Sequence, residues 1–248
     1  MRAGDARDAT VGCDEGGMQL VDADGAKRRY ASLPDELDRA GGGAANTAAM
    51  VAKLGGEVTF IGRVADDALG ASFTHDIRGV GVTFNPPAAA EVPPTAHCTT
   101  LISPDGERTM NTFLGACGLL SPNDIDAEVI GTAGVVYVEG FLWDPPSGRE
   151  AVLAAIELAQ RAPRPVALAL NDPYCVDRHR REFFDVLEGS IDIVFGNESE
   201  ACALFETDDV EDALVRLGAI CPLTVVTRSE KGSSLVVTLG FALGLIYL

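Results

Sequence analysis

Residues 41–70 read GGGAANTAAMVAKLGGEVTFIGRVADDALG, and this stretch does most to define the fold. Three glycines open a turn, Asn46 follows, and an alanine-rich helix is predicted to begin at once; a strand is predicted at Val58–Val64, before the acidic pair Asp66–Asp67. Glycines before a helix let a ligand approach the backbone closely, and the free amides of the first turn favour electron-rich groups. The Asn46 amide both donates and accepts, which suits a pair of vicinal hydroxyls. An ordinary glycine-rich loop of an α/β protein is an equally weighted alternative.

The composition narrows the class of protein and its partners. An apolar content of 47% is ample for a core, and 248 residues suffice for one large α/β domain or two small ones. The formal charge of −18 argues against nucleic acid and anionic membranes as partners, because both need basic patches, but backbone amides can still hold nucleotide phosphates. Six widely spaced cysteines and three scattered histidines favour reduced thiols in the cytoplasm over a disulfide framework or a metal cluster. The polar start MRAGDARDATVGCDEGG is not expected to be a secretion signal.

Short apolar runs alternate with helical patterns through the second half of the chain. Buried strands are predicted at Val135–Val138, Val166–Leu170, Ile191–Phe195 and Leu223–Val226, and helices at Gly148–Arg161, Asp177–Leu187, Glu198–Phe205 and Val210–Leu217. Repeated β-α-β units indicate a mainly parallel sheet flanked by helices. We therefore expect a single α/β domain over residues 1–248.

A separate element is predicted at residues 95–113. Two β-rich segments, TAHCTTLIS and RTMNTF, flank the turn sequence Pro104–Glu107, which indicates an antiparallel hairpin. Such a hairpin is either a lid over a ligand or an ordinary edge hairpin, and the sequence favours neither.

Polar residues recur where the predicted parallel strands end. These ends carry Glu139–Gly140, Asn171–Asp172, Asn197–Glu200 and Thr227–Gly232. Open parallel sheets bind ligands at their carboxyl edge, so the four ends together predict a site. Taken singly, Asp172 could cap the next helix, and Asn197 could form a capping box with Glu200.

These pieces together resemble the ribokinase-like (PfkB) carbohydrate kinases, most of all the bacterial adenosine-kinase type. The matching segments are GGGAANTAAMVAKLGG, FIGRVADDALG, PDGERTMNTFLGA, NESE and TRSEKGS, and the similarity runs from about Gly16 to about Val237. The order and spacing of GGxxxN, NxxE and TxxxxG are fairly specific, although no one of them is specific alone. The resemblance implies a ribokinase-like fold with lid elements at about 14–35 and 95–114.

The resemblance also implies ATP and Mg²⁺ as cofactors and assigns roles to particular residues. It places Gly42, Gly43 and Asn46 on the sugar hydroxyls, and Arg108 over the phosphates as the lid closes. It assigns Asn197 and Glu200 to hydrated Mg²⁺, and Thr227 and Gly232 to the nucleotide, with Ser229 where many members have glycine; Asp172 lies near the phosphate path.

The implied reaction is transfer of the γ-phosphoryl group of ATP to a primary hydroxyl of a nucleoside or sugar, with adenosine favoured. In the family a C-terminal motif, D-T-x-G-A-G-D, supplies the base and an anion hole, but this sequence continues from Val237 only as TLGFALGLIYL. A positioned base contributes about 10²–10⁴-fold, so we expect this chain to be weakly active or inactive. We expect it to be cut short or shifted out of frame near Val237. Met1–Cys13 does not resemble the usual first strand of the family, which carries a sugar-binding aspartate, and Asp14 is a poor substitute for that aspartate.

Two other functions account for parts of the sequence. A dinucleotide-dependent oxidoreductase is disfavoured, because the segment before the glycines, LPDELDRA, looks helical and GGGAAN lacks the fingerprint spacing. A non-catalytic nucleoside- or sugar-binding protein stays open, since such a site survives without its base. The acceptor and a homodimeric state are likewise left open by the sequence.

Overall fold

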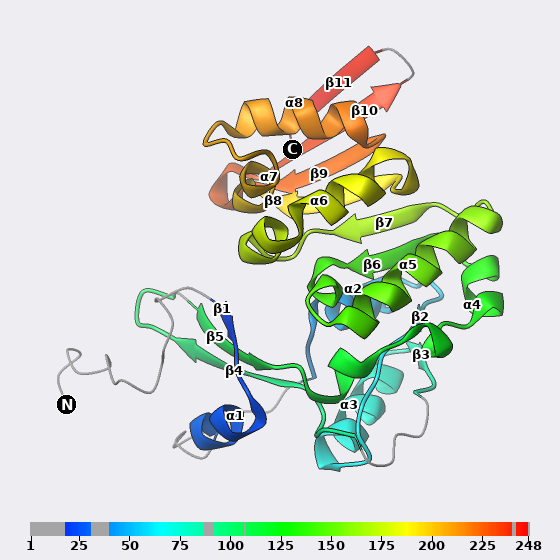
Figure 1. Ribbon diagram of the computed structural model, residues 1–248, viewed down its shortest axis with the longest axis vertical. Coiled ribbons are helices and arrows are strands. Elements are labelled where there is room, and N and C mark those ends of the chain that lie inside the picture. Colours follow the sequence, from blue (N-terminus) through cyan, green and yellow to red (C-terminus); the bar gives the residue numbers. More distant parts are fainter. Residues whose placement is uncertain (1–17, 31–39, 87–91, 107, 240–241, 248) are drawn as a thin grey trace.

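The computed structural model describes residues 18–30, 40–86, 92–106, 108–239 and 242–247. Within these residues the strands form a six-stranded sheet, a three-stranded sheet and a two-stranded pair. The six-stranded sheet and its helices make up the main body, and the three-stranded sheet projects from its side (Figure 1). The fold is α/β, as the sequence predicts.

The six-stranded sheet has the order β11-β10-β9-β8-β7-β6. Its strands are β6 Val136–Glu139, β7 Val166–Ala169, β8 Ile193–Asn197, β9 Leu223–Thr227, β10 Ser233–Leu239 and β11 Ala242–Tyr247. Strands β6 to β9 are parallel neighbours, whereas β10 pairs antiparallel with both β9 and β11. The four apolar runs predicted from the sequence are therefore the four parallel strands.

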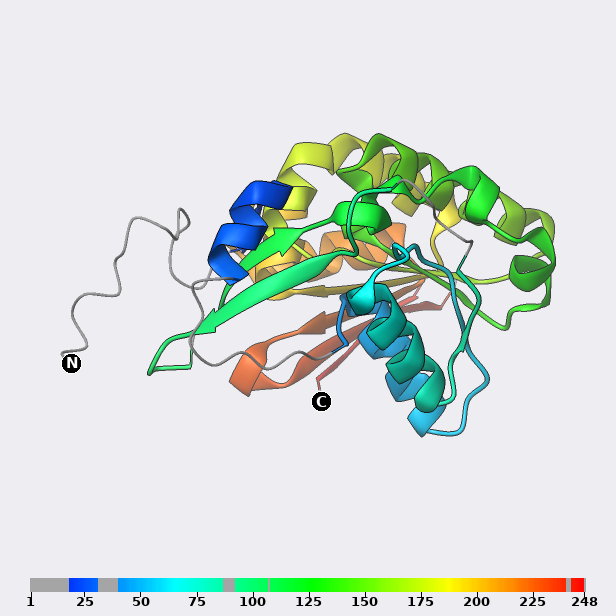
Figure 2. The same ribbon diagram turned by 90° about the horizontal axis from the view of Figure 1, so that it is seen from below.

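Helices cover one face of this sheet. They are α4 Ala127–Thr132, α5 Pro146–Arg161, α6 Pro173–Ser190, α7 Glu198–Phe205 and α8 Val210–Ile220, with short 3₁₀ turns η1 Gly115–Leu119, η2 Pro122–Asp124, η3 Gly140–Trp143 and η4 Ser229–Lys231. In Figure 2 the yellow and green helices α5 and α6 lie together on one side of the strands. The main core forms there: Leu168 and Val194 of the sheet are fully buried, and Trp143 stacks on Phe183 with ring centroids 4.8 Å apart.

A smaller layer packs beside β6. It contains α2 Gly43–Lys53, β2 Thr59–Phe60, α3 Ala68–Gly79 and β3 Thr83–Phe84. Its core joins Ala45 and Ala48 of α2 to three phenylalanine rings, Phe60, Phe73 and Phe84, whose centroids lie 5.3–5.9 Å apart. This layer fixes α2 against the end of β6.

The predicted hairpin is part of the three-stranded sheet, whose order is β1-β5-β4. Its elements are β1 Met18–Leu20, β4 His97–Ile102 and β5 Arg108–Phe113, with α1 Ala23–Tyr30 beside it. Strands β4 and β5 are antiparallel, as predicted, and β1 adds parallel to β5. Asp67 anchors the hairpin: it caps α3 through the Gly70 amide and also accepts from the Thr95 amide and hydroxyl, at 2.7–2.8 Å. Residues 14–17 and 31–35 of the first predicted lid element lie outside the described residues.

Two local predictions need correction. The strand expected at Val58–Val64 is confined to Thr59–Phe60, because its partner β3 is equally short and pairs in register only with these two residues. The helix expected after Asn46 begins at Gly43, so Asn46 lies in its first turn. The predicted helix LPDELDRA falls mostly on residues outside the described ranges. No helix in the described ranges is long and apolar enough to cross a membrane.

Candidate active site

The parallel strands bring the predicted strand-end residues to one edge of the sheet. Glu139 pairs in register with Ala169 of β7, and Asn197 pairs with Thr227 of β9. Asn171 follows β7 in a left-handed conformation (φ 69°). Because β6 to β9 all point the same way, the groups that follow them meet in one region.

The amino end of α2 closes against Glu139 at this edge. A Cβ atom at Gly43 would lie 2.0 Å from Glu139 Oε1 and 3.4 Å from Asn171 Nδ2, so a larger residue here would displace the Glu139 carboxylate. The Ala44 amide donates to the Glu139 carboxylate. No side chain caps this helix at Gly42, whose φ is 113°. The Glu139 carboxylate therefore lies at the amino end of the helix, where the helix dipole stabilises an anion.

Burial raises the pKa of the Glu139 carboxyl from 4.5 to about 7, although hydrogen bonds from Ala44 and Asn171 oppose the shift. Asn171 links the two strand ends: its Nδ2 lies 3.4 Å from Glu139 Oε1, and its Oδ1 accepts from the Gly140 amide at 2.7 Å. The sequence marks Glu139 and Asn171 only as strand-end residues and predicts no role for them. Their position directly after two neighbouring parallel strands is the feature of the sequence that could have identified them as site residues.

Asn197 and Glu200 form the capping box that the sequence offered as their structural role. Glu200 accepts from the Asn197 amide (3.0 Å) and side chain (2.7 Å), and Asn197 Oδ1 accepts from the Glu200 amide at 2.9 Å. Glu200 is only 5% exposed, and burial raises its pKa to about 7. A buried carboxylate with both oxygens already engaged suits a metal ion held through water rather than directly.

Asp172 lies close to Glu200 and caps α6. Its Oδ2 accepts from the Cys175 amide at 2.8 Å, and its charge contributes to the raised pKa of Glu200. Burial raises the pKa of Asp172 as well. Two carboxyls whose pKa is raised by burial therefore lie near each other at this edge, which makes the edge a candidate functional site.

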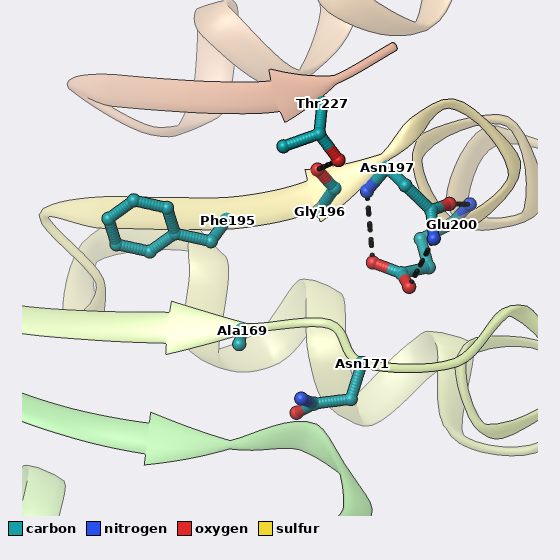
Figure 3. A pocket seen from close by; sticks show the side chains of 7 residues that line it. All are labelled: Ala169, Asn171, Phe195, Gly196, Asn197, Glu200 and Thr227. Carbon is teal, nitrogen blue, oxygen red and sulfur yellow. Dashed lines mark hydrogen bonds between the residues drawn. The ribbon is translucent and has the colours of Figure 1, made fainter. Parts of the chain in front are cut away.

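A pocket of about 240 Å³ opens between the ends of β7, β8 and β9. Figure 3 shows its lining: Ala169, Asn171, Phe195, Gly196, Asn197, Glu200 and Thr227. Three residues predicted for the nucleotide and metal, Asn197, Glu200 and Thr227, are thus brought together, and Thr227 Oγ1 donates to the Gly196 carbonyl at 3.4 Å. Phe195 gives the pocket an apolar side.

The remaining predicted residues are not part of the lining of this pocket. Gly42, Gly43 and Asn46 are at the start of α2, next to Glu139. Gly232 ends the turn after β9 with φ 84°, and its carbonyl accepts from the Arg228 amide at 2.7 Å. Arg108 opens β5 opposite Ile102, exposed on the projecting sheet. In Figure 1 this sheet lies on the side to which the arrows of β6 to β9 point.

A further group of possible ligands joins the residue after η3 to the first turns of α6. Asp144, Cys175 and His179 offer atoms within 4.8 Å of one another. However, Arg178 already binds Asp144 through two nitrogens, at 3.0 and 2.7 Å, and His179 Nε2 lies 2.9 Å from the same carboxylate. The Arg178 guanidinium neutralises the Asp144 carboxylate and would compete with any metal ion, so we interpret the group as an ion-pair network.

Comparison with known proteins decides the family. Residues 29–242 match the pfkB family carbohydrate kinases. This chain belongs to that family. The PfkB chain superposes on an adenosine kinase from Sinorhizobium meliloti with a TM-score of 0.90 and 43% identity, covering 95% of this chain and 72% of that one. A probable sugar kinase from Rhizobium etli CFN 42 gives a TM-score of 0.89, also at 43% identity, covering 94% and 71%.

A 5-dehydro-2-deoxygluconokinase from Photobacterium profundum is 30% identical over 213 residues, which are 78% of this chain. The matched part spans 62% of the length of that relative. The PfkB relatives are kinases of sugars and nucleosides, so the family of this chain is a phosphotransferase family.

Proposed function

We propose that this PfkB chain binds adenosine or a closely similar nucleoside and serves transfer of the γ-phosphoryl group of ATP to its primary hydroxyl. The 43% identity to the Sinorhizobium meliloti adenosine kinase over 95% of this chain supports adenosine as the acceptor, and the equal identity to the Rhizobium etli probable sugar kinase makes a sugar the competing acceptor. The curated sugar-kinase relative shares 30%. Free thiols at the five described cysteines support a cytoplasmic location.

The acceptor site is assigned to the junction of α2 and β6. The side chain of Asn46 and the open backbone at Gly42 and Gly43 offer donors and acceptors to vicinal hydroxyls. The Glu139 carboxylate, which accepts from the Ala44 amide, would accept a hydrogen bond from one of these hydroxyls. Because a side chain at position 43 would strike Glu139, the glycine and the carboxylate act as one unit.

The nucleotide is assigned to the pocket between β7 and β9, with Thr227 and the Gly232 turn at its rim. Glu200 and Asn197 fit a hydrated Mg²⁺ held through water, because the buried carboxylate and the Asn197 amide oxygen are both acceptors that the water ligands of the ion could reach. When bound, the ion would neutralise phosphate charge. Asp172 adds a second carboxyl beside Glu200. Arg108 would reach the phosphates only after the three-stranded sheet closes as a lid over the strand ends.

Binding without turnover is the second candidate function. Asp172, Asn197 and Glu200 all cap helices, so the positions expected to handle phosphate and metal also have structural roles. Weak or absent turnover by this chain therefore stays a prediction, together with the lid and the single-domain organisation over residues 1–248.

The test is formation of AMP from ATP and adenosine, followed by chromatography, with ribose and fructose as competing acceptors. Adenosine binding is measured in parallel by calorimetry. Asn46→Ala should weaken adenosine binding by about tenfold, because it removes hydrogen bonds to the hydroxyls. Lys53→Ala, at the far end of the same helix, is the matched control. Binding of fructose but not adenosine would overturn the choice of acceptor.

A further inference from the structure

Residues 227–232 form the turn between the antiparallel strands β9 and β10, and we call them the β9–β10 turn. Its backbone is closed by hydrogen bonds of its own. The Arg228 amide donates to the Gly232 carbonyl at 2.7 Å, and the Lys231 amide donates back to the Arg228 carbonyl at 2.9 Å. The Gly232 amide donates to the Ser229 carbonyl at 3.1 Å. The first residue of the turn, Thr227, lines the pocket.

Two residues of the β9–β10 turn have a positive φ, and one of them is not a glycine. Gly232 has φ 84°, which costs a glycine little. Ser229 has φ 51°, in the left-handed region that its Cβ atom disfavours. A residue other than glycine keeps such a conformation where the surrounding structure holds it there. We therefore expect an anchor for this turn outside its own backbone.

The side chain of Arg228 supplies this anchor and is only 12% exposed. Its Nε donates to Glu198 Oε1 of α7 at 2.8 Å. Its Nη1 donates to Glu211 Oε1 of α8 at 2.9 Å and to Ser234 Oγ of β10 at 3.3 Å. A guanidinium carries several donors in one rigid plane, so a single arginine can bind acceptors from different elements at once. Arg228 thus joins the turn to three neighbouring elements, and Lys231 Nζ lies 3.6 Å from the same oxygen of Glu198.

Arg228 makes these contacts on the opposite side of β9 from the pocket. Side chains alternate along a strand, so Val226 and Arg228 point one way and Thr227 points the other way. Val226 is fully buried in the core under the helices, whereas Thr227 lines the pocket. Arg228 itself does not line the pocket, and any effect it has on a ligand there must pass through the residues that it holds.

The ion pair of Arg228 with Glu198 also connects the turn to the capping box. Asn197 and Thr227 pair in register at the ends of β8 and β9, and Glu198 and Arg228 are the next residues along the two strands. Figure 3 shows Asn197 and Thr227 at these neighbouring ends. Glu198 lies in the first turn of α7, between Asn197 and Glu200. The ion pair therefore fixes the start of α7 relative to the β9–β10 turn.

We propose that Arg228 is a positioning residue that clamps the β9–β10 turn to the capping box of Asn197 and Glu200. The clamp holds two parts of the proposed nucleotide site, the turn and the metal-binding pair, in one geometry. This consequence for the nucleotide rests on the proposed function, whereas the clamp rests on the contacts alone. The proposed acceptor site is built from α2 and the end of β6, so loss of the clamp should weaken binding of Mg²⁺–ATP and spare adenosine.

The test compares wild type with Arg228→Met and Arg228→Lys in two measurements. Exchange of the Lys231 and Gly232 amides is followed by NMR without any ligand, and the dissociation constants of Mg²⁺–ATP and adenosine are measured by calorimetry. Arg228→Met removes every side-chain donor, so both amides should exchange about tenfold faster and Mg²⁺–ATP should bind about tenfold more weakly. Arg228→Lys keeps the charge and can still reach one carboxylate, so both effects should be smaller.

Arg161→Met is the matched control, because Arg161 also forms an ion pair, with Glu157 on α5, but lies far along the chain from the turn. It should change neither measurement. Unchanged amide exchange in Arg228→Met would overturn the clamp, and if that variant does not fold, unchanged exchange in Arg228→Lys would do so. An equal loss of Mg²⁺–ATP and adenosine binding would overturn the positioning role in favour of general destabilisation. If wild type binds no ATP, the proposed nucleotide site is wrong and the positioning role falls with it, whereas the exchange rates still decide whether the clamp exists.

Discussion

Replacing Glu139 by glutamine should stabilise the protein at high pH and leave it unchanged at low pH. The pKa of this carboxyl rises from 4.5 to about 7 on folding, chiefly through burial. The folded state therefore holds the proton more tightly than the unfolded state, and the free energy of unfolding falls as the pH rises from 4.5 through 7. A shift of this size corresponds to about 3 kcal/mol. Glutamine has no charge to bury, so the variant escapes this loss.

The measurement is urea denaturation of wild type and Glu139→Gln at pH 4.5 and pH 8. We expect the variant to be more stable by about 2–3 kcal/mol at pH 8, with part of the gain offset by a weaker contact to the Ala44 amide, and to match wild type at pH 4.5. Glu150→Gln, at an exposed position on α5, is the control and should change little at either pH. The stabilised variant should also bind adenosine more weakly, as expected where a site keeps a costly charge for function. An equal effect of Glu139→Gln at both pH values, or destabilisation at pH 8, would refute the reasoning.

Three further predictions follow from the structure. Gly43→Ala should cost about 1–3 kcal/mol of stability and abolish adenosine binding, because its Cβ would strike Glu139, whereas Gly79→Ala has open space and should be neutral in both assays. Asp67→Ala should lower the free energy of unfolding by about 2–3 kcal/mol in urea denaturation at pH 7, because it removes a helix cap and two hydrogen bonds from Thr95. These hydrogen bonds lower the pKa of Asp67 despite its burial, so its stabilising contribution should persist above pH 3.8 and vanish as the pH falls through the lowered pKa. A difference in stability that does not depend on pH would contradict this. Glu200→Gln should raise the Mg²⁺ concentration needed for ATP binding by about tenfold in calorimetric titrations while the far-ultraviolet circular dichroism stays unchanged, and an unaltered Mg²⁺ dependence would remove Glu200 from the metal site.

Much of the fold follows from local patterns in the sequence. The four apolar runs became the four parallel strands, since a run bounded by polar residues has few alternatives once helices separate it from the next. The hairpin was predictable because Pro104–Glu107 is a turn sequence between two β-rich segments. The addition of β1 to β5 was not predictable residue by residue, because pairing of distant strands leaves no local signal.

The site was predicted less completely than the fold. Parallel strand direction is enough to place Asn197 and Thr227 together, and the capping box of Asn197 and Glu200 could be read from their spacing. The contact of Gly43 with Glu139 could not be read, because it joins a helix start to a strand end far away in the sequence. The raised pKa of Glu139 was equally hidden, since it arises from burial in the assembled fold.

Thermal denaturation of the purified chain, with and without saturating adenosine, tests the central claim most directly. A ligand at about 100 times its dissociation constant adds about 2.7 kcal/mol to the free energy of unfolding of a protein that binds it only when folded. The account predicts a cooperative transition that adenosine shifts upward and that ribose and fructose leave in place. A transition that none of these ligands moves, or one moved by fructose and not by adenosine, would contradict it.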